Sequence, residues 1–344
     1  MTDFPPITNE QELDELMSRP RRILIEFMKS VTSPLVILGA GGKMGPTLAI
    51  LARRAALEAG NSLKIIAISR FSDPEVRQNL ERQGVHTLSV DLMERSSYEQ
   101  LPDASHVIYL IGLKFGTSLN PGMTWATNTL IPAYTCERYP HSKMVALSSG
   151  NVYPLTPVQG PGARETDPLE PLGEYSNSCV ARERIFDYYS SRNGTPIALI
   201  RLFYALDLRY GVLFDIAKRV FTGEPIDLAT GYFNCIWQGD ANEMIIRALS
   251  LVGSPPYALN LTSPARFSVR QVAQEFSHLM GKYAILEGVE TDSALLGNTE
   301  KLTAILGEPG TPWDWAMRWT ADWVMMGGSS LSKPTHFETR NGKY

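Results

Sequence analysis

The chain has 344 residues, of which 44% are hydrophobic, 9% aromatic and 20% charged. At roughly 150 residues per domain this length allows about two domains, and the composition is typical of a folded globular protein rather than a disordered one. With 32 Lys and Arg against 36 Asp and Glu, the net charge of −4 excludes a protein that binds nucleic acid through an excess of positive charge.

Residues 1–33 predict a short helical extension that packs onto the main domain or onto a partner subunit. From Pro34, short apolar runs alternate with helix-length segments, which is typical of a parallel sheet covered by helices on both faces. Strands are expected at 35–38, 63–69, 85–90, 106–111, 143–148 and 196–202. Helices are expected at 46–59, 73–83, 96–101, 125–139 and 174–191. We therefore predict an α/β fold with a Rossmann-type doubly wound sheet, whose ligand crevice lies beyond the carboxyl ends of the strands.

The regular alternation ends near residue 205, where Gly, Pro and aromatic residues become frequent. We assign 34–205 to a dinucleotide-binding domain, to which a later segment at about 232–262 returns. Residues 206–326 predict a smaller C-terminal α/β lobe that binds the substrate. Residues 327–344 lack apolar periodicity and are expected to form a flexible tail.

The sequence also lacks the features of membrane, secreted and metal-binding proteins. No apolar run approaches the ~20 residues of a membrane span, and the first thirty residues mix Asp, Glu and Pro, unlike a signal peptide. The three cysteines and five histidines are dispersed, without the spacing of a disulfide framework or a metal site. We expect a cytoplasmic protein with no metal and with neither nucleic acid nor a membrane as partner.

A glycine-rich loop joins the first predicted strand directly to a helix that Pro46 opens. Gly39 suits the tight turn, Gly42 lets a diphosphate approach the backbone, and Gly45 allows close packing of helix on strand. We expect Gly39, Gly42, Lys43, Met44 and Gly45 to bind a dinucleotide. The alternative is an ordinary glycine-rich turn.

The end of the second strand indicates which dinucleotide is bound. NAD-binding sites carry a carboxylate there, whereas this chain has Ser69 and Arg70, which suit the 2′-phosphate of NADP. Lys43 is expected to add a second cation, although Arg70 is alternatively a solvated loop charge. Asp91 and Leu92, after the third strand, are expected at the adenine edge. NADP is favoured and NAD remains possible.

Further motifs in chain order complete a resemblance to a known family. They are Leu35–Gly45, Ala146–Pro154, Tyr175–Glu183, Trp237–Asp240 and Leu259–Asn260. From Leu35 to about Val324 the chain resembles the extended short-chain dehydrogenase/reductases, the NAD-dependent epimerase/dehydratase family of sugar enzymes. The resemblance implies that Ser149 and Tyr175 do the chemistry, with the phenol exchanging a substrate proton and the serine orienting the same oxygen. The alternatives are a capping hydroxyl and a core tyrosine.

The chain departs from the family's pattern four residues after this tyrosine, where Cys179 stands in place of a lysine. The lysine's charge would lower the pKa of the tyrosine by about 1–3 units, and a cysteine does not replace it. Arg182, one turn further along the helix, or Lys114, in the loop after the fourth strand, is a candidate substitute. Cys179 itself is expected to be structural rather than a nucleophile.

A second departure concerns the substrate. Tyr204 stands where nucleotide-sugar enzymes of the family carry an asparagine, and the segment before Trp237 lacks their arginine. These absences favour a free sugar, sugar acid or sugar phosphate over a nucleotide sugar. The candidate substrate residues are Lys114, Asn151, Glu165, Tyr204, Arg209 and Trp237. Glu165 is also a candidate for an extra acid/base step.

The predicted function is therefore an NAD(P)-dependent oxidoreductase, epimerase or dehydratase of carbohydrates. Its cofactor site is expected to include Ile111, Gly112, Ser148 and Phe203 at strand ends, together with Tyr175. The alternative is a catalytically impaired dinucleotide-binding protein that acts as a sensor or scaffold. By resemblance we also expect a homodimer through helices 125–139 and 174–191.

Overall fold

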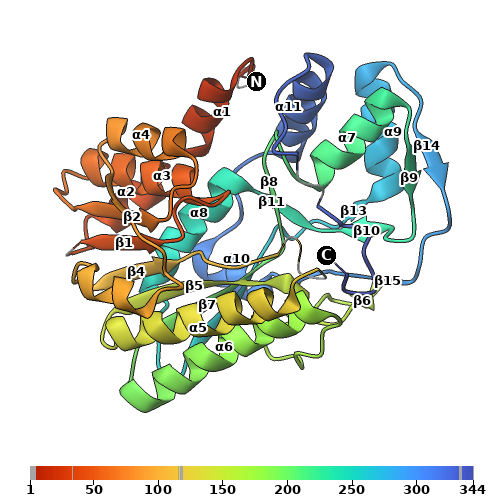
Figure 1. Cartoon of the computed structure of the whole chain (residues 1–344). Coiled ribbons are helices and arrows are strands. Elements are labelled where there is room, and N and C mark those ends of the chain that lie inside the picture. The colour runs from red at the N-terminus through yellow and green to blue at the C-terminus, as the bar shows by residue number, and fades with distance from the viewer. Residues whose placement is uncertain (1–4, 33, 115, 117–118, 333–334, 344) are drawn as a thin grey trace.

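The computed structural model describes residues 5–32, 34–114, 116, 119–332 and 335–343, and its centre is a seven-stranded sheet (Figure 1). Its strands are β1 (Leu35–Leu38), β2 (Ile65–Ser69), β3 (His86–Ser89), β4 (His106–Tyr109), β5 (Lys143–Ser149), β7 (Ile197–Leu202) and β12 (Tyr257–Leu261). The strand order is β12-β7-β5-β4-β1-β2-β3, and every neighbouring pair is parallel. The predicted doubly wound sheet is confirmed. Its order reverses between β1 and β4, which places the ligand crevice at the carboxyl ends of these two strands.

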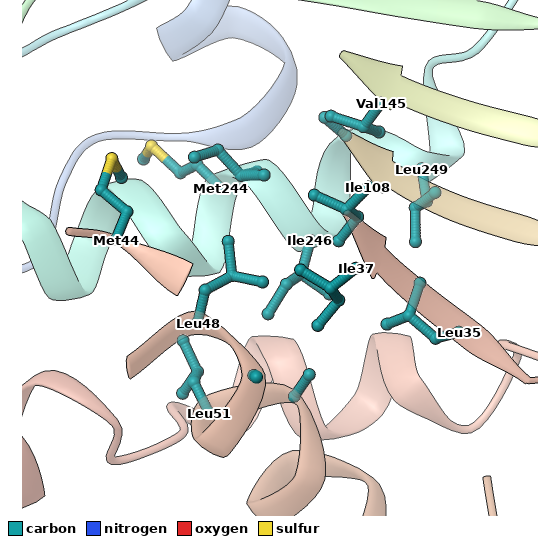
Figure 2. Packing of buried hydrophobic residues seen from close by; sticks show 14 of the residues in the cluster. Leu35, Ile37, Met44, Leu48, Leu51, Ile108, Val145, Met244, Ile246 and Leu249 are labelled. Atoms are coloured by element: carbon teal, nitrogen blue, oxygen red, sulfur yellow. The ribbon is translucent and has the colours of Figure 1, made fainter. Parts of the chain in front are cut away.

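Helices cover both faces of the sheet, because neighbouring residues of each strand point to opposite sides. On one face Leu35 and Ile37 of β1 pack with Leu48 and Ile246, as Figure 2 shows. The helices on this face are α2 (Arg22–Met28), α3 (Gly45–Glu58), α4 (Pro74–Arg82) and α8 (Gln238–Arg247). The other face carries the 3-10 helix η1 (Arg95–Gln100), α5 (Pro121–Arg138) and α6 (Glu174–Asn193). The core on that side includes Val36 of β1 and Phe186 of α6.

Helix α5 begins four residues before its predicted start, because the preceding residues favour a helix start. The Asn120 side chain caps the helix by accepting a hydrogen bond from the Met123 N–H at 3.1 Å. Pro121 follows in the first turn, where its missing N–H costs no hydrogen bond. Helix α6 begins at the predicted residue, Glu174.

The chain after β7 builds a second hydrophobic core beside the sheet. The main helices of this second core are α7 (Val212–Thr222), α9 (Val269–Met280) and α11 (Trp313–Met325). The remaining short helices of the chain are α10 (Glu300–Leu306) and the 3-10 helices η2 (Gly150–Val152) and η3 (Ala248–Ser250). Four short two-stranded sheets lie outside the central sheet. They pair β8 (Tyr204–Leu206) with β11 (Cys235–Trp237), β9 (Pro225–Asp227) with β14 (Ile285–Glu287), β10 (Tyr232–Phe233) with β13 (Phe267–Ser268), and β6 (Thr156–Pro157) with β15 (Ser293–Ala294). Helix α8 returns to pack against α3, and β12 joins the sheet.

The N-terminal residues connect the two cores. Helix α1 (Glu10–Met17) buries Leu13 and Met17 in the second core, whereas α2 buries Leu24 and Met28 in the core under the sheet. Within the residues that the structure describes, none of the helices combines the length and the apolarity of a membrane span.

Residues 335–343 correct part of the prediction of a flexible tail over 327–344, whereas residues 327–332 are mostly exposed. Thr335 and Phe337 are each only 1% exposed. The Thr335 N–H donates to the Asp215 carboxylate at 3.0 Å, and Arg340 Nη1 donates to the Ser293 carbonyl at 2.7 Å, beside β15 (Figure 1). A single buried aromatic residue and a few hydrogen bonds hold this segment in place. An isolated buried residue and scattered hydrogen bonds leave no periodic pattern of apolar residues in the sequence, so a helix or strand is not predicted there.

Candidate active site

A cavity of about 200 Å³ lies at the carboxyl ends of the central strands. Its walls come from the residues after β4, β5 and β7, from the start of α6, and from the glycine-rich loop. The lining residues are Lys43, Met44, Leu110, Ile111, Gly112, Lys114, Leu147, Ser148, Ser149, Asn151, Tyr175, Arg182, Leu202, Phe203, Tyr204, Ala205, Tyr210, Gly211, Leu295 and Thr335. The cavity thus lies at the edge of the sheet where a doubly wound fold binds its ligand.

The glycine-rich loop leads from this edge into α3, and its geometry requires small residues. Gly39 has a φ of +82°, and a Cβ there would lie 2.7 Å from Ile111 Cγ1. A Cβ on Gly45 would overlap the backbone of Ala40, whereas the nearest atom to a Cβ on Gly42 is the Gly39 oxygen at 3.3 Å. Helix α3 begins without a side-chain cap, so its first N–H groups suit an anion. These residues fit the diphosphate of a dinucleotide.

Ser69, Arg70 and Asp91 lie together at the ends of β2 and β3. Arg70 Nη1 is 3.8 Å from Asp91 Oδ2, and both side chains are largely exposed, so this ion pair is weak. Leu92 differs from the prediction, because its side chain is buried in the core beside Tyr98 and does not face an adenine.

The structure brings Ser149 and Tyr175 together in the cavity. Ser149, the last residue of β5, accepts a hydrogen bond from the Asn151 N–H at 3.1 Å, and its hydroxyl lies close enough to Tyr175 to lower the pKa of the phenol. Tyr175 lies in the first turn of α6, and Cys179 follows it one turn later on the same helix. Ser149 is therefore both a capping hydroxyl and a cavity residue.

The Arg182 guanidinium lies next to Cys179. Its Nη2 lies 3.4 Å from Cys179 Sγ, while its Nη1 donates to the Ile111 carbonyl at 3.1 Å and to Asn128 Oδ1 at 3.2 Å. Asn128 is fully buried on α5 and donates to Ser178 Oγ at 2.8 Å. These bonds fix the guanidinium between α5, α6 and the loop after β4.

Burial raises the pKa of the Tyr175 phenol well above its ordinary value, and the neighbouring Cys179 raises it further. The positive charge of Arg182 and the nearby Ser149 hydroxyl act in the opposite direction and lower this pKa. Burial also raises the pKa of the Cys179 thiol, which disfavours the thiolate that a nucleophilic cysteine requires.

Lys43 corrects the prediction that it faces the 2′-phosphate of a cofactor. Its ammonium donates to the Ala205 carbonyl at 2.8 Å and lies 4.1 Å from the centre of the Tyr210 ring. Both partners follow β7, whereas Ser69 and Arg70 end β2. The side chain leaves the glycine-rich loop on the side of the cavity, so its charge lies near Ser149 and Tyr175 rather than near the adenosine end.

Several other predicted residues line the cavity. They are Met44, Ile111, Gly112, Ser148 and Phe203 from the cofactor prediction, and Lys114, Asn151 and Tyr204 from the substrate prediction. Ser148 also donates to Glu183, which Arg201 Nη2 contacts at 2.8 Å.

Three predicted substrate residues lie elsewhere. Glu165 Oε1 accepts the Asn260 N–H at 2.9 Å and is not among the lining residues, so no acid/base role follows from its position. Arg209 binds the carboxylates of Asp207, Glu10 and Asp14. Trp237 packs against Trp319 in the second core, with ring centres 5.4 Å apart. Each has at least one structural partner far away in the sequence: Asn260 for Glu165, the carboxylates of α1 for Arg209, and Trp319 for Trp237.

The sequence did not single out Asn128, Tyr210, Leu295 or Thr335 as functional residues. Tyr210 and Leu295 enter the cavity wall from loops, and Thr335 enters from the C-terminal segment. An asparagine inside the apolar pattern of α5 is the one available signal, because a buried amide needs partners.

Comparison with known proteins agrees with this architecture. The model of the NAD dependent epimerase/dehydratase family matches residues 35–221, and no curated protein matches the chain. A UDP-glucuronic acid 4-epimerase from Bacillus cereus, solved with NAD, is 16% identical with a TM-score of 0.70, covering 87% of this chain and 99% of its own. A UDP-glucose 4-epimerase from Thermus thermophilus, also solved with NAD, is 20% identical with a TM-score of 0.67, covering 85% and 99%. The enzyme of that name from Thermotoga maritima is 16% identical, with a TM-score of 0.68 and coverage of 86% and 99%.

Proposed function

The chain belongs to the NAD-dependent epimerase/dehydratase family, an enzyme family that uses a nicotinamide dinucleotide, and we propose that it is an active oxidoreductase or epimerase of a carbohydrate smaller than a nucleotide sugar. The observation that carries this proposal is that Ser149, at the end of β5, and Tyr175, in the first turn of α6, line the same cavity at the strand ends.

In this proposal Tyr175 exchanges the proton of a substrate hydroxyl, and Ser149 holds the same oxygen in place. A bound nicotinamide dinucleotide would supply the hydride acceptor and donor. The backbone of the glycine-rich loop and the first turn of α3 would hold its diphosphate. Phe203 and Leu202 contribute apolar side chains to the cavity wall, and we expect them to limit the access of water to the reacting atoms.

Arg182 takes over the electrostatic role of the family's missing lysine as a positioning residue that acts through Tyr175. The guanidinium is 4% exposed and is fixed by three neighbours, so its charge is poorly screened by water. Its effect on the tyrosine is the one that a lysine would have: it lowers the pKa of the phenol.

Arg182→Met is expected to move the acidic limb of the pH–rate profile to higher pH by about 1–3 units. The sign follows because loss of the cation removes an influence that lowers the pKa of Tyr175, so the phenolate forms only at higher pH. Arg182→Lys is expected to restore most of the profile. A uniform drop in turnover with an unchanged profile would leave Arg182 with a structural role alone.

The preference for a small substrate has support in the second core. Phe233, in the segment where family members carry an arginine, is fully buried, and Cys235 and Trp237 are buried beside it. Thr335 closes one wall of the cavity, and Phe337 and Arg340 line an adjoining hollow of about 180 Å³. The C-terminal segment therefore occupies part of the space on the substrate side.

We favour NADP over NAD because β2 ends in Ser69 and Arg70 rather than in a carboxylate. The structural neighbours from Bacillus cereus and Thermus thermophilus contain NAD, so the two cofactors must be compared directly. Calorimetry is expected to show tighter binding of NADP. Arg70→Ala is expected to weaken NADP about tenfold, through loss of a charge-assisted hydrogen bond, and to leave NAD unchanged. Tighter binding of NAD by the native protein would reverse the assignment.

The decisive experiment joins cofactor binding to turnover. The purified protein is titrated with NAD and NADP, and then incubated with each cofactor and a panel of aldoses, aldonates and sugar phosphates while absorbance at 340 nm is followed. Because an epimerase can return its hydride, products are also separated by chromatography. Cofactor binding without any product would favour the alternative that Cys179 suggests, a dinucleotide-binding sensor or scaffold.

We also propose a homodimer that forms through α5 and α6. These helices pack on each other and expose Met123, Trp125, Leu130 and Tyr188. Light scattering is expected to give twice the mass of the chain, and a monomeric mass would refute the dimer.

A further inference from the structure

The cavity beside Tyr175 is positively charged. Three cationic side chains line it: Lys43, Lys114 and Arg182. Among the described residues that line it, none is an aspartate or a glutamate. Arg182 is 4% exposed and donates to the Ile111 carbonyl and to Asn128, whereas the two lysines donate to the carbonyls of Ala205 and Thr335. An arrangement of this kind favours a ligand with negative charge.

The two lysines are held by different segments of the chain. Lys43 Nζ is 2.8 Å from the Ala205 carbonyl, at the start of the chain that leads into the second core. Lys114 Nζ is 3.3 Å from the carbonyl of Thr335, in the C-terminal segment. Each ammonium therefore has a carbonyl that sets its position. Because an ammonium has three N–H donors, one carbonyl does not use the full capacity of Lys43 to bind a further group.

The carboxylates nearest to these lysines have other partners. Lys43 experiences the charges of Asp207, Arg209, Lys114 and Asp215, and Lys114 experiences that of Asp215. Asp207 binds Arg209 at 2.9 Å, and Asp215 accepts hydrogen bonds from the N–H and hydroxyl of Thr335. Burial lowers the pKa of Lys43 to about 7 and that of Lys114 to about 8. An anion placed between them would favour their charged forms.

We propose that Lys43 and Lys114 bind a carboxylate or phosphate group of the substrate, so that the enzyme acts on an acidic carbohydrate. This inference rests on the proposed function and specifies the substrate class of the same cavity. The diphosphate of the cofactor is the other possible source of negative charge. It is expected at the first turn of α3, whereas the ammonium of Lys43 lies beyond it, against Ala205 and Tyr210.

The test uses the full chain saturated with its cofactor, and three probes of one sugar: glucose, glucuronate and glucose 6-phosphate. Calorimetry is expected to show at least tenfold tighter binding of one or both anionic probes than of glucose. Lys43→Met, which keeps most of the apolar stem of the side chain and removes its charge, is expected to weaken that binding at least tenfold. The affinity for the cofactor alone is expected to change less than twofold.

Lys301→Met is the matched control. Lys301 also donates to a backbone carbonyl, that of Ala258 at 2.6 Å, and lies over a tyrosine ring, Tyr257, at 3.8 Å, but it is not a cavity residue. This variant is expected to bind every probe as the native protein does. The same losses in both variants would mean that removing any such lysine disturbs the fold.

Proton uptake gives a readout that does not depend on turnover. Because a bound anion raises the pKa of Lys43, the native protein is expected to take up protons on binding the anionic probe at pH 8. The apparent binding enthalpy should then vary with the ionisation enthalpy of the buffer, and less so in Lys43→Met.

Equal binding, or no binding, of the charged and neutral probes would overturn the proposal. Loss of cofactor affinity in Lys43→Met would assign the lysine to the cofactor instead. A native protein that bound no cofactor would refute the proposed function itself.

Discussion

Replacement of Tyr175 by phenylalanine is expected to reduce turnover by about 10²–10⁴-fold, the usual contribution of general acid–base catalysis. The change removes only the hydroxyl of this cavity residue and leaves the buried ring in its place. Affinity for the cofactor is expected to stay within about twofold, because the glycine-rich loop and the first turn of α3 are untouched. Initial rates with the best substrate of the panel, together with calorimetry, measure both effects.

Tyr139→Phe is the matched control for this prediction. Tyr139 is equally buried, and its hydroxyl donates to the Pro102 carbonyl at 3.0 Å, at the opposite end of α5 from the cavity. We expect this variant to keep its turnover within about twofold. Unchanged turnover in Tyr175→Phe would remove Tyr175 from the mechanism, and equal losses in both variants would show only that buried tyrosine hydroxyls stabilise the fold.

The parts of the site that were predictable are those that local sequence determines. The first strand, the three glycines and the helix that follows form one continuous signal, and the structure places them at the crevice. Ser149 ends a strand and Tyr175 begins a helix, so the topology of the sheet brings them to the same edge although they are far apart in the chain.

What could not be predicted is the direction in which long side chains point. The sequence places Lys43 in the glycine-rich loop, but its contact with Ala205 joins residues 162 positions apart. Arg209 has the same charge in a loop and is neutralised by Asp207 and by carboxylates of α1. Both are basic residues beside glycine or aromatic residues, and only their partners in the folded chain distinguish a cavity residue from a structural one.

The C-terminal segment shows the same limit at the level of the backbone. Its contacts with Asp215 and Ser293 cross 120 and 47 residues, and it has no helix or strand of its own among its described residues. Composition alone therefore indicates a tail. In the folded chain the segment packs against the second core, and Thr335 lines the cavity that the substrate would enter.

Glu183→Gln is expected to lower the free energy of unfolding by about 3–5 kcal/mol, because it leaves the Arg201 charge buried without its partner. The two side chains are 2% and 6% exposed, and Arg201 bonds both carboxylate oxygens of Glu183, at 3.1 and 2.8 Å. Ser148 donates to the same carboxylate, next to Ser149, so the pair also anchors the end of β5. Urea unfolding measures the loss.

The pair Arg77–Glu81 on α4 is the control, because its ions are at a similar distance, 2.9 Å, but nearly half exposed. Glu81→Gln is expected to cost at most about 1 kcal/mol, since water screens this pair in the folded state and solvates either ion after its partner is removed. The double variant Glu183→Leu with Arg201→Met separates charge from packing. It removes both ions and is expected to be more stable than Glu183→Gln, because no unpaired charge remains in the core. If the single and double variants lost equal stability, the cost would lie in the shape of the site rather than in the unpaired arginine, and the electrostatic account of this network would be wrong.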